Sequence, residues 1–252
     1  IHPSAIVDKN ASLADNVTIG PFCIIEDDVA IGSDTTICGY TIVHKYTRIG
    51  KNCRDFSHNS IGGIPQDMKF AGEKSLLEIG DNTTIREFCT LNRGTKDTGK
   101  TAIGSNVLLM AYVHAAHDCS IGDNTILANG VQLGGHVKVG EHVIIGGMTP
   151  VHQFCKIGDN AMIGGGFRVV QDVPPYTLAA GEPLKYSGLN STGLRRRGFS
   201  PDIRKQIKQV YHFIYNSGLN KKQALLEITA KMDTTVFEIQ NIVNFLETSE
   251  RG

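Results

Sequence analysis

An aliphatic side chain recurs at every sixth position over most of this chain. In the series that starts at Ile1 and ends at Val169, 24 of 29 positions are Ile, Leu or Val. A six-residue period matches neither the 3.6-residue period of an amphipathic helix nor the alternation of a half-buried strand, and it is typical of hexapeptide β-helices. The pattern therefore predicts a solenoid of short parallel strands over the first two thirds of the sequence.

A slower repeat sets the number of sides of this solenoid. Pairs of an aliphatic residue and a glycine recur every 18 residues, at 103–104, 121–122, 139–140 and 157–158. Three hexapeptides therefore make one triangular coil, with one aliphatic residue from each side pointing inward. The 28 glycines in 252 residues fit a chain that consists largely of turns.

Five positions of the six-residue series break the aliphatic rule: Asp55, Asp67, Glu73, Asp97 and Ala115. An unpaired carboxylate in the core would cost several kcal/mol. We therefore expect the chain to leave the coils in two projecting loops, near 62–78 and 92–100, which contain three of the four acids. No such loop surrounds Asp55, which predicts only a local irregularity.

Paired prolines in "QDVPPY", at 171–176, interrupt the repeat, and helical patterns follow it. The sequence therefore predicts a mainly β chain in two parts. A parallel β-helix covers residues 1–189, and a C-terminal α-helical domain covers residues 190–252.

The expected helices have recognisable boundaries. Ser200 followed by proline is a helix start signal, and Gly218 is a stop signal. Two further helical patterns cover about 220–232 and 235–248.

Composition indicates which kinds of partner this protein binds and in which cellular compartment it acts. Lys and Arg number 25, as do Asp and Glu, so no net charge favours nucleic acid. No apolar run approaches the ~20 residues of a membrane span, and no signal peptide is visible. Cys119 and Cys155 lie two coils apart, roughly 10 Å if coils are spaced as strands are, which is too far for a disulfide. Reduced thiols in a cytoplasmic protein are therefore expected.

The segment "VHAAHDCSIG", from 113 to 122, places histidines and an aspartate within this regular scaffold. Counted from the aliphatic residue that starts each coil, His117 follows by 14 residues and His152 by 13, and Asp118 and His136 both follow by 15. Because coils stack about 4.8 Å apart, these side chains should gather on one wall.

Three interpretations of this wall remain open. The histidines could pack a subunit interface, or they could hold zinc, since imidazoles on neighbouring coils are suitable ligands. They could also carry out proton transfer, with one histidine as general base and a carboxylate that fixes its tautomer. Gly134 and Gly135 precede His136, one coil from His117, and favour the third interpretation because they leave a backbone N–H accessible to an oxyanion.

Two other features indicate either a ligand or packing. Side chains shrink along the stack from Met110-Ala111 through Ala128-Asn129 and Gly146-Gly147 to Gly164-Gly165, which predicts a shallow trough for a ligand or a neighbouring subunit. The run Arg195-Arg196-Arg197 could be a solvated turn or could bind a diphosphate.

Six motifs carry a resemblance to a known family, and they occur in this order: "IPQDMKFAGE", "HAAHDC", "GGH", "VHQFCKIG", "QDVPPY" and "LRRRGFS". Together with the hexapeptides they resemble the UDP-N-acetylglucosamine O-acyltransferases of lipid A synthesis over essentially the whole chain. The resemblance implies a left-handed β-helix, a homotrimer with active sites between subunits, and a helical C-terminal domain.

The same resemblance implies a reaction and a set of site residues. A 3-hydroxyacyl group would pass directly from acyl carrier protein to the 3-hydroxyl of UDP-N-acetylglucosamine, the first step of lipid A synthesis, without metal, cofactor or acyl-enzyme. His117 would be the general base, Asp118 its partner and Gly135 the oxyanion donor. The residues that would bind the sugar, the nucleotide and the acyl chain are Gln66, Asp67, Lys69, His114, His136, His152, Gln153, Gly165, Asn190, Arg196 and Arg197. Asn92 stands where the family often has histidine, and Pro183 where some members gauge acyl length.

Other functions stay open as alternatives. The N-acyltransferase of the same pathway usually carries an N-terminal uridine-binding domain, whereas hexapeptides here begin at Ile1. A metal-dependent β-helix lyase would need the zinc interpretation of the wall. A non-catalytic trimeric scaffold would keep the repeat without needing the histidine motifs.

Overall fold

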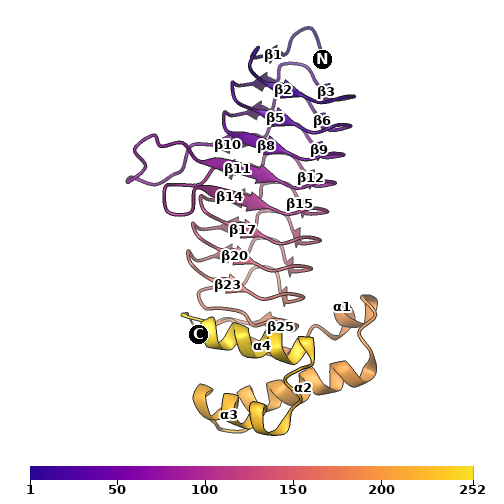
Figure 1. Cartoon of the computed structure of the whole chain (residues 1–252), viewed down its shortest axis with the longest axis vertical. Helices are drawn as coiled ribbons and strands as arrows, with labels where there is room; N and C mark the ends of the chain where they lie inside the picture. The colour runs from indigo at the N-terminus through magenta and orange to yellow at the C-terminus, as the bar shows by residue number, and fades with distance from the viewer. Residues whose placement is uncertain (252) are drawn as a thin grey trace.

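The computed structural model describes residues 1–251 and shows a column of triangular coils that ends in a group of helices (Figure 1). Three parallel sheets form the sides of the column, and each coil contributes one short strand to each sheet. The chain is a left-handed parallel β-helix of hexapeptide repeats with a helical C-terminal part. The repeat predicts the β-helix, the helical patterns after it predict the helical part, and the family resemblance implies the hand.

Each sheet stacks strands that are three apart in the chain. The first sheet contains β1 (Ile6–Val7), β4 (Ile24–Ile25), β7 (Ile42–Val43), β10 (Ser60–Gly63), β13 (Thr90–Asn92), β16 (His114–Ala115), β19 (Gln132–Leu133) and β22 (Pro150–Val151). The second contains β2 (Ser12–Leu13), β5 (Ala30–Ile31), β8 (Thr47–Ile49), β11 (Leu76–Ile79), β14 (Lys100–Ile103), β17 (Ser120–Ile121), β20 (Lys138–Val139) and β23 (Lys156–Ile157). The third contains β3 (Thr18–Ile19), β6 (Thr36–Ile37), β9 (Arg54–Asp55), β12 (Thr84–Ile85), β15 (Leu108–Leu109), β18 (Ile126–Leu127), β21 (Ile144–Ile145), β24 (Met162–Ile163), β25 (Thr177–Ala180) and the antiparallel β26 (Lys185–Leu189).

The six-residue period arises because one strand and one tight turn together occupy six residues. The second residue of each short strand points into the column, where the aliphatic series forms one continuous core. At the turns, 20 non-glycine residues have positive φ, a conformation that is uncommon outside glycine. Asp118 (φ 61°) and His136 (φ 62°) both occupy such turns, so the fold fixes the directions of their side chains.

Asp55 is not at an irregularity, contrary to the expectation from sequence. It lies in β9 in register with Ile37 and Ile85, with its side chain inside the column and 1% of its surface exposed. The Asn59 amide donates to Asp55 Oδ1 at 2.6 Å, while Oδ2 has no hydrogen-bond partner among residues 1–251. Burial raises the pKa of this carboxyl to about 7, against the lowering effect of that hydrogen bond.

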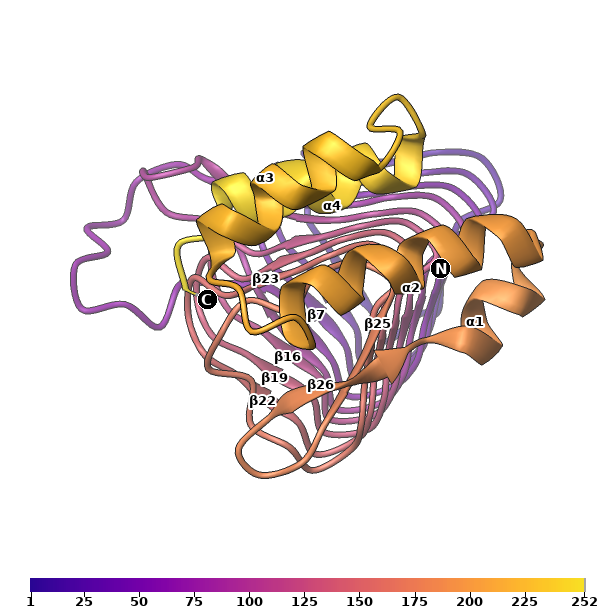
Figure 2. The same ribbon diagram turned by 90° about the horizontal axis from the view of Figure 1, so that it is seen from below.

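The chain leaves the coils over residues 64–75 and again over 93–99, and both loops project from the same side of the column (Figures 1 and 2). Asp67, Glu73 and Asp97 lie in these loops, outside the core, whereas Ala115 is fully buried within its coil.

Four helices follow the last coil: α1 (Ser191–Arg196), α2 (Pro201–Tyr215), α3 (Lys221–Lys231) and α4 (Phe237–Thr248). The three predicted helices are confirmed, and α1 is an addition. Ser200 caps α2 by accepting from the Ile203 N–H at 3.2 Å, and Asn220 forms a capping box with Gln223 in α3. Over residues 1–251, no helix combines the length and hydrophobicity that crossing a bilayer would require.

The helices pack as a second core against the end of the column. Tyr176 belongs to this second core although it precedes the helices. The Asn241 amide donates both to the Tyr176 hydroxyl and to Asp159 in the last coils, each at 3.0 Å. All six cysteines are free thiols. The division of the chain at residue 190 stays a prediction.

Candidate active site

His117 and Asp118 form a hydrogen-bonded pair on the turn that follows β16. Nδ1 of His117 lies 2.8 Å from Oδ2 of Asp118. The His117 side chain is 13% exposed and that of Asp118 is fully enclosed. Because the carboxylate accepts the Nδ1 proton, Nε2 is left as the basic nitrogen of the neutral ring. The pair therefore has the geometry of a general base with an orienting carboxylate.

Asp118 accepts hydrogen bonds from the projecting loop as well as from His117. The N–H of Thr95 donates to Oδ1 at 3.0 Å, its hydroxyl donates to Oδ2 at 2.7 Å, and the Thr98 hydroxyl contacts Oδ1. Burial by itself raises the pKa of Asp118, but the hydrogen bonds outweigh it and hold the pKa at about 2. The carboxylate is therefore ionised throughout the neutral range.

The next coil supplies His136 and Gly135. The His136 ring lies edge-on to that of His117 with centroids 5.2 Å apart, and its Nε2 is 3.6 Å from Asp118 Oδ2. A β-carbon at Gly135 would lie 2.8 Å from His117 Nε2, so any side chain there would displace the imidazole. Within residues 1–251 the Gly135 N–H donates to no acceptor, which leaves it available to an incoming oxyanion.

The other two histidines of the wall, His114 and His152, form hydrogen bonds to residues outside the His117–Asp118 pair. His114 Nδ1 is 2.7 Å from the Thr90 hydroxyl, and burial lowers the pKa of His114. His152 is exposed, with Nδ1 3.0 Å from the carbonyl of Gln153 in its own turn. The predicted gathering of His117, Asp118 and His136 is thus confirmed, whereas no hydrogen bond within residues 1–251 links His152 to them.

The loop 64–75 carries Gln66, Asp67 and Lys69. Within the loop, the Lys69 N–H donates to Asp67 Oδ1 at 3.0 Å. No hydrogen bond among residues 1–251 connects any of the three side chains to the His117–Asp118 pair.

Two residues at the end of β13 and just after it fasten this loop. The Asn92 amide donates to the Ile64 carbonyl at 3.0 Å. The buried Arg93 guanidinium lies 5.2 Å from the Tyr46 ring and 5.3 Å from the Phe70 ring. Sequence reasoning missed Arg93, because its aromatic partners come from two other parts of the chain.

Three ligand atoms of His117, Asp118 and His136 lie within 4.8 Å of one another, a spacing compatible with a metal ion. The hydrogen bonding of Asp118 does not fit that use. Oδ2 already accepts two hydrogen bonds, and Oδ1 accepts from the Thr95 N–H and contacts the Thr98 hydroxyl, whose single proton is shared with the Lys100 carbonyl 2.8 Å away. A metal would have to displace the Thr95 or Thr98 donors or the His117 ring, so the arrangement favours proton transfer.

The predicted trough follows the corner between the third and first sheets. Gly165 is exposed near its end, and a β-carbon there would lie 3.1 Å from the carbonyl oxygen of Gly147 on the previous coil. The upstream end of the same corner is a column of stacked rings, with centroids 5.0 to 5.1 Å apart, formed by Phe22, Tyr40, His58, Phe88 and Tyr112.

Three of the four predicted nucleotide-binding residues, Asn190, Arg196 and Arg197, lie around α1, whereas Gln153 lies on the turn after β22. Asn190 is the N-cap of α1: its side chain accepts from the Gly193 N–H at 3.1 Å and donates to the Asn160 carbonyl at 2.9 Å. Arg196 is exposed, whereas Nε and one terminal nitrogen of Arg197 are buried without an acceptor in residues 1–251. An unsatisfied buried guanidinium is costly and suits an anionic ligand.

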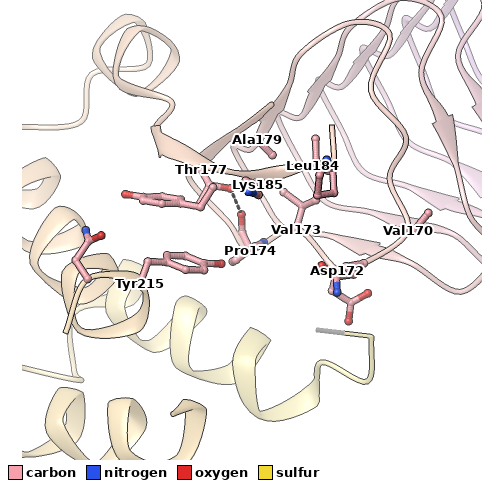
Figure 3. A pocket seen from close by; sticks show the side chains of 13 residues that line it. Val170, Asp172, Val173, Pro174, Thr177, Ala179, Leu184, Lys185 and Tyr215 are labelled. Carbon is pink, nitrogen blue, oxygen red and sulfur yellow. Dashed lines mark hydrogen bonds between the residues drawn. The ribbon is translucent and has the colours of Figure 1, made fainter. Parts of the chain in front are cut away.

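A separate cavity of about 530 Å³ lies between the β25–β26 hairpin and α2 (Figure 3). Val170, Val173, Ala179, Pro183 and Tyr215 are among the side chains that line it, and none of the histidines does. The His117–Asp118 pair does not line this cavity.

Comparisons with known proteins identify the family. Profiles of two families match: UDP N-acetylglucosamine O-acyltransferase, domain 2, over residues 172–252, and bacterial transferase hexapeptide (six repeats) over residues 100–135. An acyl-[acyl-carrier-protein]--UDP-N-acetylglucosamine O-acyltransferase from Psychrobacter is 50% identical over 253 residues, which cover 100% of this chain and 98% of that protein. The chain belongs to the UDP-N-acetylglucosamine O-acyltransferase family. The same enzyme of Thermodesulfovibrio yellowstonii is 43% identical with equal coverage.

Solved structures of UDP-N-acetylglucosamine O-acyltransferases agree with the whole fold. That of LpxA from Bacteroides fragilis, a UDP-N-acetylglucosamine acyltransferase, superposes with a TM-score of 0.98 at 44% identity, and that of LpxA from Acinetobacter baumannii with 0.97 at 45%. Each comparison covers 100% of this chain and 98% of the other. The family, the fold class and the enzyme class of O-acyltransferase are therefore confirmed, and the roles of individual residues stay predictions.

Proposed function

We propose that this protein transfers an (R)-3-hydroxyacyl group from acyl carrier protein to the 3-hydroxyl of UDP-N-acetylglucosamine, the first step of lipid A biosynthesis. The family supports the donor and acceptor, which the names of the relatives state. The observation that carries the mechanism is the His117–Asp118 pair, with the His117 ring packed against Gly135.

The reaction follows from this arrangement. Nε2 of His117 takes the proton of the sugar hydroxyl as its oxygen attacks the thioester carbonyl, while Asp118 stabilises the imidazolium through Nδ1. The Gly135 N–H donates to the oxyanion of the tetrahedral intermediate. Collapse breaks the C–S bond, and the thiolate of the carrier protein receives the proton from His117. The acyl group moves directly, so no residue becomes acylated.

Substrate binding would use residues of the histidine wall, of the projecting loop and of α1. His114, His136 and His152, with Gln66, Asp67 and Lys69 of the projecting loop, would contact the sugar or position the site. Gln153, Asn190, Arg196 and Arg197 would hold the nucleotide. The buried, unsatisfied nitrogens of Arg197 support this assignment.

We propose that the protein is a homotrimer with its active sites between subunits. We also propose that it acts in the cytoplasm. The loop 64–75 and α1 lie on opposite sides of one chain (Figures 1 and 2), so a site containing both needs a second copy. Phe22, Tyr40, Phe88 and Tyr112 in the ring column are 46 to 60% exposed. Exposed apolar patches of this kind are commonly covered by a partner.

Product analysis distinguishes this function from its rivals. Purified protein is incubated with a series of 3-hydroxyacyl carrier proteins and either UDP-N-acetylglucosamine or its 3-amino analogue, with and without a chelator. We expect a mass increment of one acyl group on UDP-N-acetylglucosamine, labile to mild base as an ester, in both conditions. Acylation of the amino sugar alone would indicate an N-acyltransferase. Loss of activity with the chelator would indicate a metal enzyme, and the absence of any product would indicate a scaffold.

The trough makes a prediction about acyl length. We expect Gly165→Met to shift donor preference toward shorter chains, because its side chain would occupy the end of the trough and cost the longest donors about 1–3 kcal/mol. The measurement is kcat/KM across donor lengths, with Gly165→Ala as a smaller step and Glu141→Met on another corner as control. The close approach to Gly147 would reduce all rates in common, so an equal loss for every donor would make Gly165 a packing residue.

A further inference from the structure

The loop 93–99 contributes the majority of the hydrogen bonds to Asp118, although none of its residues belongs to the predicted site. Three of the four donors to the carboxylate come from Thr95 and Thr98, and the fourth is His117; the Thr98 hydroxyl also lies 2.8 Å from the Lys100 carbonyl, which competes for its proton. A further bond, from the Asp118 N–H to the Thr101 hydroxyl at 2.8 Å, fixes the backbone of the same residue.

We propose that Thr95 and Thr98 are positioning residues for acyl transfer: they hold the Asp118 carboxylate in the orientation that fixes the ring of His117. This inference rests on the proposed function and deepens it. Neither threonine touches the reacting atoms, so each acts through Asp118.

The two oxygens of Asp118 are distinguished by their partners. Oδ2 is shared between the Thr95 hydroxyl and His117 Nδ1, whereas Oδ1 accepts from the Thr95 N–H and faces the Thr98 hydroxyl. Without these donors, the carboxylate could rotate and withdraw Oδ2 from His117. The imidazole would then lose the bond that keeps its proton on Nδ1 and leaves Nε2 basic.

The loop is firmly attached to the coils and can therefore act as a support. The Arg93 N–H donates to the Gly63 carbonyl at 3.0 Å, and the Gly94 N–H donates to the Leu76 carbonyl at 3.1 Å. The Thr95 carbonyl accepts from the Gly99 N–H at 2.8 Å, which closes the loop on itself. Thr95 is 4% exposed, so solvent does not replace its hydroxyl as a donor.

The test substitutes the hydroxyls one at a time. Thr95→Val keeps the shape and the backbone donor but removes the hydroxyl, and Thr95→Ser restores it. We expect Thr95→Val to lower kcat by about 10- to 100-fold, equivalent to one hydrogen bond to a charged group, with the KM for UDP-N-acetylglucosamine little changed. Thr95→Ser should recover most of the rate. Thr98→Val, at an exposed position, should fold normally and lower kcat in the same direction.

Thr125→Val is the matched control for burial and hydrogen bonding. Thr125 is also buried, donates to the Gly140 carbonyl at 2.9 Å and accepts from the Val143 N–H at 3.2 Å, on a different corner of the column from His117. It should lose stability comparably and keep kcat. The inference is overturned if Thr95→Val and Thr98→Val both keep kcat, if Thr95→Ser is as slow as Thr95→Val, or if Thr125→Val is equally slow.

A readout independent of turnover separates this inference from the proposed function. Nitrogen-15 spectra of histidine-labelled protein report which ring nitrogen of His117 carries the proton. We expect a single Nδ1–H form in the wild-type protein and a mixture in Thr95→Val. Wild-type protein without acyltransferase activity would refute the proposed function, whereas unchanged His117 spectra in the valine variants would refute only the positioning role.

Discussion

His117→Ala is expected to reduce acyl transfer by about 10²- to 10⁴-fold, the usual contribution of a general base, while the protein stays folded. The ring lies on the outer wall of the column, and within residues 1–251 its side chain makes one hydrogen bond, to Asp118. After its removal the carboxylate keeps its donors from Thr95 and Thr98, so little stability should be lost. The comparison is kcat with the preferred acyl donor, alongside thermal unfolding.

His212→Ala serves as the matched control because His212 is an exposed histidine on α2. It should retain full activity. Retention of more than a tenth of the wild-type rate in His117→Ala would place the base elsewhere, with His136 as the next candidate because its Nε2 lies 3.6 Å from Asp118 Oδ2. Loss of folding in His117→Ala, but not in His212→Ala, would make the pair a structural element.

The six-residue period made most of the column predictable. Once the period is counted, every residue has a coil number and a position within the coil, so contacts between coils follow from arithmetic. Counting alone predicts that Asp118 lies beside His136 and that His117 lies beside Gly135, and both are neighbours in the column. Handedness could not be obtained in this way, because the period is the same for either hand and ordinary parallel crossovers are right-handed.

Contacts outside the repeat could not be predicted by counting. Thr95 and Thr98 lie in a loop, where no register connects sequence position to coil position, and "TKDT" reads as a polar turn. The aromatic partners of Arg93 come from separate parts of the chain for the same reason. The short helix α1 was also missed, since its six residues offer little helical periodicity.

Asp55 shows a different limit of pattern reasoning. A carboxylate in an aliphatic position was expected to distort the coil, because a buried charge is costly. The coil keeps its register, and burial raises the pKa of Asp55 to about 7, so that protonation removes the buried charge as the pH falls below that value. A pattern of residue types does not specify protonation, so the sequence left both solutions open.

This buried carboxyl predicts a pH-dependent stability. Its folded-state pKa, about 7, exceeds the ordinary aspartate value of 3.8, so native protein retains a proton that the unfolded chain releases as pH rises through this window. The contribution of Asp55 to the free energy of unfolding should therefore be greatest below about pH 4, and it should fall as the pH rises toward 7. The difference between the folded and unfolded pKa values of Asp55 corresponds to roughly 4 kcal/mol of unfolding free energy, which is a large part of the stability of a typical domain.

Asp55→Asn isolates this contribution, because an amide has nearly the same shape and does not titrate. Its oxygen can still accept from the Asn59 amide, as Oδ1 of Asp55 does. We expect the variant to gain stability relative to wild type as the pH rises from 4 to 8, measured by denaturant unfolding at one protein concentration. Asp27→Asn, at an exposed turn, should show no comparable trend. A difference between Asp55→Asn and wild type that stays constant with pH would mean that Asp55 is ionised inside the column, and that Asn59 alone compensates its charge.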